Sequence, residues 1–166
     1  MNQEEIKYWM RFAYSEALRS PDPSTQNGAV IVRDNVTLGR GFNEFPRGVH
    51  YTPERLERPL KYAFVEHAER NAIFDAAQDL EGSTMYALWA ACSDCARAII
   101  QSGIKELVTH SFYSNKDERP PLRKDWKASI SEAFQMFQEA EVQVTFTDVS
   151  LDVTRPLRFN GQEVTF

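Results

Sequence analysis

Apolar residues recur along the first part of this chain with two different periods, and these periods predict helices and strands in alternation. Apolar side chains at positions 6, 9, 10, 13 and 17 follow the spacing of one helix face, so residues 3–19 are predicted to form a helix. The prolines and turn residues of SPDPST, residues 20–25, end it. Residues 28–43 predict two strands joined by a tight turn at Asp34-Asn35.

The alternation continues through the rest of the chain. Helices are predicted at residues 66–78, 92–102 and 126–140. Gly103 is expected to form the C-terminal cap of the helix at 92–102. Strands are predicted at residues 84–90, 105–110 and 141–149. Residues 46–63 and 114–124 are rich in proline and charge and are expected to form loops, and no element is assigned after Ser150.

This order of elements, α-β-β-α-β-α-β-α-β, predicts an α/β fold. Alternating elements build a sheet that is covered by helices on both faces. Right-handed crossovers after residues 84–90 and 105–110 would make those strands parallel.

Composition narrows the range of functions. A length of 166 residues suits one domain, assigned here to residues 1–166. The net charge of −5 argues against a dedicated nucleic-acid-binding protein, which normally carries a basic face. No apolar run is long enough to span a membrane, and the first residues lack the pattern of a signal peptide, so we expect a cytoplasmic protein.

The two cysteines provide the first candidate chemistry. Cys92 and Cys95 form a C-x-x-C pair, which in a cytosolic chain is typical of metal binding or redox activity. A redox pair usually encloses Gly-Pro or an aromatic residue, whereas Ser93 and Asp94 stand here. A metal site needs at least one further ligand. His67 is a candidate for it, and Glu69 follows two residues later.

The predicted helices bring these groups together. His67 and Cys92 each open a helix, and a strand lies between the two helices, so both helix starts can meet at one edge of the sheet. Two thiolates and one imidazole leave the fourth tetrahedral position of a zinc ion to water, as in catalytic zinc sites. Helix N-termini favour thiolate over thiol. Glu69 need not bind the metal, and its carboxylate can take a proton from the bound water.

These motifs resemble those of a known family. His67-Ala68-Glu69 followed by Cys92-x-x-Cys95 resembles the H-x-E…P-C-x-x-C signature of zinc deaminases. DPSTQNGAVIV, GRGFNEFPRG, HAERNAI and CSDCARAIIQSGIKELV extend the likeness to the deoxycytidylate (dCMP) deaminase family, over roughly residues 3–148. The resemblance implies a three-layer α/β/α sandwich with a five-stranded mixed sheet. It also implies hydrolytic deamination of dCMP to dUMP, a supply of dUMP for thymidylate synthesis, one Zn²⁺ per chain, and a homo-oligomer, often a hexamer.

The resemblance also implies contacts with the nucleotide. Asn43 would bind a ribose hydroxyl, and the backbone N–H of Ala68 would bind the cytosine carbonyl. The ring of Tyr113 would line the site, and Thr25 is a further candidate for substrate binding. Thr25 as a simple turn residue and Tyr113 as a core aromatic residue are the open alternatives.

Positively charged loop residues and two departures from the family bear on phosphate recognition and regulation. Arg47, Arg55 and Arg58 are candidate phosphate ligands, with solvated loop charges as the alternative. Asn27 replaces the family's usual valine beside the expected base pocket. Glu44 replaces a glycine in the segment through which many relatives bind dCTP as an activator. The negative charge of Glu44 would repel the triphosphate of dCTP, so we predict weak or absent activation. Arg47 or a bridging Mg²⁺ would reduce that repulsion.

Two alternatives to dCMP deamination remain open at this point. The first keeps the chemistry and changes the substrate to dCTP, a modified cytosine nucleotide, free cytidine or a base in RNA; the acidic net charge counts against a polynucleotide. The second is a non-catalytic zinc-binding module. Glu69 argues against that module, because a structural zinc does not require this carboxylate.

Overall fold

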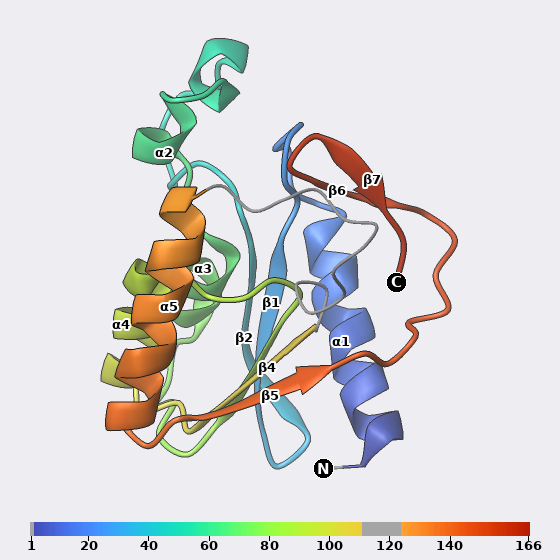
Figure 1. The fold of residues 1–166 in the computed structure, drawn as a ribbon, viewed down its shortest axis with the longest axis vertical. Coiled ribbons are helices and arrows are strands. Elements are labelled where there is room, and N and C mark those ends of the chain that lie inside the picture. The colour runs from blue at the N-terminus through green and yellow to red at the C-terminus, as the bar shows by residue number, and fades with distance from the viewer. Residues whose placement is uncertain (1, 111–123) are drawn as a thin grey trace.

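A five-stranded mixed sheet forms the centre of the computed structural model, which describes residues 2–110 and 124–166 (Figure 1). The strand order is β2-β1-β3-β4-β5. The strands are β1 Gly28–Arg33, β2 Val36–Phe42, β3 Thr84–Ala87, β4 Glu106–His110 and β5 Gln143–Thr147. β1 pairs antiparallel with β2 and β3, whereas β3, β4 and β5 are parallel to one another. The predicted parallel pair and the five-stranded mixed sheet are confirmed.

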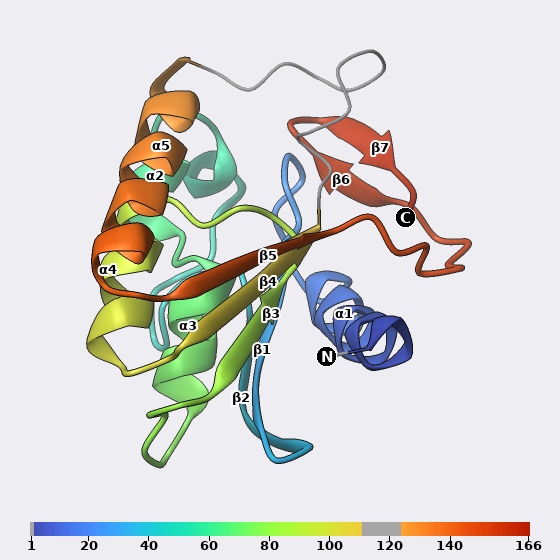
Figure 2. The same ribbon diagram turned by 60° about the horizontal axis from the view of Figure 1, so that its bottom comes forward.

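Helices cover both faces of this sheet and give the predicted three layers. The long helices are α1 Gln3–Ala17, α3 Ala68–Asp75, α4 Ser93–Gln101 and α5 Lys124–Glu139. Figure 2 shows α1 on one face of the sheet and α3, α4 and α5 on the other. Residues 46–63, predicted to be an irregular loop, contain two short turns of helix, η1 Pro53–Leu56 and α2 Lys61–Phe64. These turns were missed because a single helical turn carries no apolar period.

Local signals explain several element ends. Asn2 caps α1 by accepting a hydrogen bond of 2.8 Å from the backbone N–H of Glu5. Asp34 and Asn35 both have positive φ, at 53° and 60°, as the two-residue turn between β1 and β2 requires. Gly103, with φ of 82°, follows the C-cap of α4 as expected.

The core lies in two parts, one on each face of the sheet. Successive side chains of β1 point to opposite faces of the sheet. Val30 and Val32 pack towards α1, whereas Ala29 and Ile31 pack towards α3, α4 and α5. Both pairs are buried, which explains why the sequence of β1 is an unbroken apolar run.

The segment after Ser150 ends in a hairpin that the sequence analysis did not assign. Its strands are β6 Leu157–Phe159 and β7 Gln162–Val164. Asn160 and Gly161 form the turn, with φ of 51° and 82°. An Asn-Gly dipeptide is a strong hairpin signal, but strands of three residues are too short to show alternation. The hairpin packs on the α1 face through Leu157, Phe159 and Val164.

None of the helices within residues 2–110 and 124–166 is both long and apolar enough for a membrane span.

Candidate metal centre and nucleotide pocket

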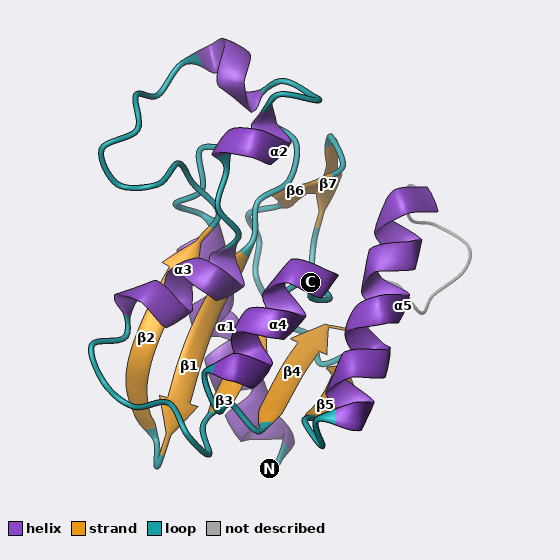
Figure 3. Cartoon of the chain, turned by 90° about the vertical axis from the view of Figure 1, so that its left-hand side faces the viewer, coloured by secondary structure: helices purple, strands orange, loops and turns teal. Residues whose placement is uncertain are grey.

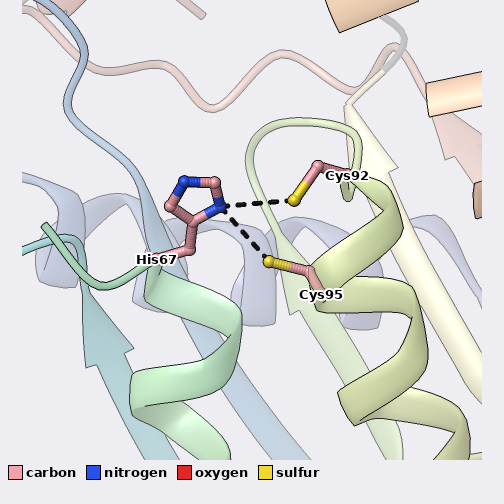
Figure 4. Close-up of side chains that lie close together, drawn as sticks. All are labelled: His67, Cys92 and Cys95. Carbon is pink, nitrogen blue, oxygen red and sulfur yellow. Dashed lines mark hydrogen bonds between the residues drawn. The ribbon is translucent and has the colours of Figure 1, made fainter. Parts of the chain in front are cut away.

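His67, Cys92 and Cys95 lie together where two helices begin. His67 is the N-cap of α3, Cys92 is the N-cap of α4, and Cys95 lies in the first turn of α4. Nδ1 of His67 is 3.5 Å from Sγ of Cys92 and 3.3 Å from Sγ of Cys95 (Figure 4). Both cysteines are buried. The structure therefore brings together the three side chains that the sequence selected.

The spacing of these atoms fits a zinc ion. With Zn–S near 2.3 Å and Zn–N near 2.0–2.1 Å, tetrahedral geometry places nitrogen and sulfur about 3.6 Å apart. The two observed separations, 3.5 and 3.3 Å, are close to that value. Three ligands leave a fourth position, and His67 and Cys92 both border a pocket. In the described part of the chain, this is the only group of three His, Cys, Asp or Glu side chains with such spacing.

The surroundings of Cys92 also favour the anionic form of its sulfur. The pKa of Cys92 is lowered to about 4, chiefly because the Cys95 thiol donates a hydrogen bond to its sulfur, with a further contribution from His67. That same hydrogen bond, together with burial, raises the pKa of Cys95. Burial alone would lower the pKa of His67, but its hydrogen bond to Cys92 and the charge of Glu69 outweigh burial and raise it. The cluster therefore stabilises negative charge that a cation can neutralise.

Glu69 lies beside the cluster without joining it. Its side chain is on the first turn of α3, is only 2% exposed and borders the same pocket. Nδ2 of Asn27 donates a hydrogen bond of 3.3 Å to Oε2 of Glu69. Burial raises the pKa of Glu69, because the charged form is poorly solvated there. A carboxylate in this setting can accept and return a proton within the pocket.

The pocket extends from the cluster to the C-terminal hairpin. Its lining comes from loop residues 22–27, from Asn43, from parts of residues 58–69 and 89–92, and from Trp126, Phe159 and Asn160. A buried ion pair crosses its wall, with Nζ of Lys61 2.6 Å from Oδ2 of Asp22. The pocket therefore combines a deep end at the metal cluster with a polar wall.

Three of the four predicted substrate-binding residues border this pocket. Thr25, Asn43 and Ala68 all line it. The hydroxyl of Thr25 accepts a hydrogen bond of 3.0 Å from the backbone N–H of Asn160, and the Asn43 amide donates to the carbonyl of Thr25 at 2.8 Å. Their contacts with a nucleotide stay predictions. Tyr113, the fourth, lies outside the described residues.

The predicted regulatory and phosphate-binding pair lies elsewhere. Glu44 and Arg47 are not among the residues that line the pocket, and Arg47 is exposed. The backbone of Glu44 exchanges two hydrogen bonds with the backbone of Glu66, of 3.2 and 2.8 Å. Arg58, also a candidate in the sequence, is the arginine that borders the pocket.

Several pocket residues were missed by sequence reasoning. The ring of Trp126 stacks on His67, with centroids 5.8 Å apart and planes inclined by 17°. Lys61 and Asp22 were not selected because their pairing joins residues 39 positions apart. Phe159 and Asn160 belong to the unassigned hairpin, and its Asn-Gly turn was the one available signal.

The amino-acid sequence of this chain is similar to those of known deaminases. A family model described as the cytidine and deoxycytidylate deaminase zinc-binding region matches residues 3–111. An uncharacterized deaminase from Aliivibrio fischeri is 38% identical over 136 residues, which cover 80% of this chain and 86% of that protein. Human deoxycytidylate deaminase is 40% identical over 126 residues, which cover 70% of this chain and 71% of that protein.

A solved structure supports the fold. The dCMP deaminase of cyanophage S-TIM5, in complex with dCMP and dUMP, superposes with a TM-score of 0.66 and 22% identity, covering 89% of this chain and 99% of that one. The family match contains His67, Glu69, Cys92 and Cys95. The first three line one pocket, and Cys95 lies beside His67 and Cys92. The chain therefore belongs to the zinc-binding cytidine and deoxycytidylate deaminase family.

Proposed function

We propose that this protein catalyses the hydrolytic deamination of dCMP to dUMP and ammonia, with one zinc ion per chain held by His67, Cys92 and Cys95. The observation that carries the proposal is a pocket that is bordered by His67 and Cys92 of this cluster and by the buried carboxylate of Glu69. The similarity to deoxycytidylate deaminases at about 40% identity supports dCMP as the substrate.

The reaction replaces the amino group at C4 of the cytosine ring with the oxygen of water. Zinc, when bound, supplies the Lewis acid that lowers the pKa of a water molecule. Glu69 accepts one proton from the attacking water and delivers it to N3 as the oxygen bonds to C4. It then carries the second proton of that oxygen to the amino group, the C4–N bond breaks, and ammonia leaves. Water and dCMP are thereby converted to dUMP and ammonia with no further reactant.

The remaining groups hold the substrate and the carboxylate in place. Ala68 is the first residue of α3, so its N–H has no partner within the helix and can donate to the cytosine carbonyl. The Asn27 amide fixes one oxygen of Glu69. A side chain oriented in this way loses less conformational freedom when it acts.

A non-catalytic zinc module is the less favoured reading. Burying a carboxylate is costly unless it is well partnered. Among the described residues, Asn27 is the only side chain that donates a hydrogen bond to Glu69, at 3.3 Å. A protein that used zinc for structure alone would gain nothing from that cost.

The test is an assay of ammonia release by the zinc-loaded protein with dCMP, dCTP, deoxycytidine and cytidine. We expect dCMP to give the highest kcat/KM. Glu69→Gln should keep its zinc and fold but lose at least ~100-fold in kcat, the low end for general acid–base catalysis. Glu57→Gln, at an exposed position outside the pocket lining, is the matched control. Near-normal turnover by Glu69→Gln, or no deamination of any of the four compounds, contradicts the proposal.

A further inference from the structure

The C-terminal hairpin is attached to the loop that forms one wall of the pocket. Four hydrogen bonds join residues 24–26 to the hairpin. The backbone N–H of Gln26 donates to the Arg158 carbonyl at 2.9 Å, and that of Gly161 donates to the Ser24 carbonyl at 2.8 Å. The backbone N–H groups of Arg158 and Asn160 donate to the side chains of Gln26 and Thr25, at 3.1 and 3.0 Å. The hairpin therefore has a defined position relative to the pocket.

Two residues of the hairpin line the pocket itself. Phe159 packs against Trp89, with ring centroids 4.6 Å apart, and both rings border the cavity. Asn160, at the turn, borders it as well. Figure 3 shows the hairpin and α2 at the same end of the molecule. The family model ends at residue 111, so this part of the wall is supplied by a segment beyond the family match.

Asn160 and Ser24 together orient Arg58. One terminal nitrogen of its guanidinium donates to Oδ1 of Asn160 at 2.8 Å and to Oγ of Ser24 at 3.0 Å. That nitrogen carries two hydrogens, so these bonds account for two of the five guanidinium N–H donors. The three remaining donors are Nε–H and the two N–H groups of the other terminal nitrogen. None of them has a hydrogen-bond partner among the described residues, and each can donate to a ligand.

The balance of charge singles out Arg58. Lys61 is the other lysine or arginine in the pocket lining, and it is paired with Asp22 at 2.6 Å, both side chains being under 10% exposed. Arg58 makes no ion pair with any carboxylate in residues 2–110 and 124–166. Its partners are two neutral oxygens, which orient the guanidinium without neutralising it.

Arg58 lies at the exposed end of the pocket, where the charged part of a ligand would remain near solvent. Ala68, Glu69 and Cys92 are buried, whereas Arg58 is exposed. A cytosine ring at the buried end would direct its 5′ substituent towards the exposed end. Each remaining guanidinium N–H can donate a charge-assisted hydrogen bond to a phosphate oxygen.

We propose that the C-terminal hairpin is a substrate-recognition element, in which Asn160 and Ser24 position Arg58 to bind the 5′-phosphate of a nucleoside monophosphate. The inference rests on the proposed deaminase function and names the residues that select its substrate. Arg58 is the phosphate ligand, and Asn160 is a positioning residue that acts through it.

The test compares dCMP with deoxycytidine in two variants. Arg58→Met should lower kcat/KM for dCMP at least tenfold and change that for deoxycytidine less than twofold. Asn160→Gly removes the amide while keeping a residue that adopts positive φ readily, so the turn is preserved. It should raise KM for dCMP at least threefold and leave kcat within twofold. Arg47→Met is the control, because Arg47 is exposed and does not line the pocket.

A binding measurement separates this inference from the proposed function. Calorimetric titration of the Glu69→Gln protein with dCMP reports phosphate recognition without turnover, and adding Arg58→Met should weaken binding at least tenfold. Unchanged dCMP affinity and an unchanged ratio of dCMP to deoxycytidine activity in Arg58→Met overturn the role of Arg58. The same loss for both substrates in that variant would also overturn it, because a phosphate ligand acts on dCMP alone. Failure of the wild-type protein to deaminate any cytosine compound overturns the proposed function instead.

Discussion

Replacing Lys61 by methionine removes one half of the buried ion pair in the pocket wall. The Lys61 and Asp22 side chains are 8% and 2% exposed, and their charged atoms are 2.6 Å apart. Methionine is similar in length but carries no charge. The variant would leave the Asp22 carboxylate buried without a cation, although three N–H donors would remain, from the Asn43 amide and the backbones of Ser24 and Thr25.

The expected loss of stability follows from this local arrangement. Breaking a buried ion pair by removing one partner costs ~3–5 kcal/mol. Because three donors still stabilise Asp22, we expect the low end, about 3 kcal/mol. A loss of 1 kcal/mol lowers Tm by roughly 2–4 °C in a domain of this size, so Tm should fall by roughly 6–12 °C. A loss of about 3 kcal/mol is a large share of the free energy of unfolding, which is ~5–15 kcal/mol for a typical protein.

The assay is thermal and urea unfolding of zinc-loaded protein, in a double-mutant cycle. Asp22→Asn combined with Lys61→Met removes both charges, so the double variant should lose less stability than the sum of the single losses, by at least ~1 kcal/mol. Lys105→Met is the control. Lys105 lies 3.6 Å from Glu81, and their side chains are 56% and 64% exposed, so its loss should be below ~1 kcal/mol. A Tm of Lys61→Met within about 2 °C of the wild type, or strictly additive losses, would refute the reasoning.

Three further predictions concern the metal, the hairpin and regulation. Elemental analysis should find one zinc per chain in the wild type and a strongly reduced content in Cys95→Ala; full retention of zinc would exclude this cysteine as a ligand. Gly161→Ala places a side chain at φ of 82° and should destabilise the protein by ~1–2 kcal/mol in urea unfolding, because L residues are strained there; an unchanged midpoint would show that the turn relaxes freely. Saturation with dCMP should be hyperbolic with or without dCTP and Mg²⁺, because the carboxylate of Glu44 would repel an anionic activator at this segment. A sigmoidal curve that dCTP makes hyperbolic would contradict that expectation.

The sequence alone determined the elements whose signals are local. The patterns of apolar residues predicted the four long helices and the five strands of the central sheet to within a few residues, since they reflect which face of each element is buried. The Asp34-Asn35 turn and Gly103 were identified because their backbone angles suit few residue types. The metal cluster was predictable for a similar reason: its ligands stand at the starts of α3 and α4, and the shared sheet brings those starts together.

Only the tertiary structure decided the contacts between distant segments. The bond from Asn27 to Glu69, the pair of Lys61 with Asp22, and the attachment of Asn160 to Thr25 join positions 42, 39 and 135 residues apart. The spacing of polar residues along the sequence does not identify such partners, because the pairing depends on how whole helices, strands and loops pack together. Among the loop arginines, the sequence could not separate Arg58 from Arg47, since both are charged residues in one irregular segment. The course of the chain between β2 and α3 places one at the pocket and leaves the other in solvent.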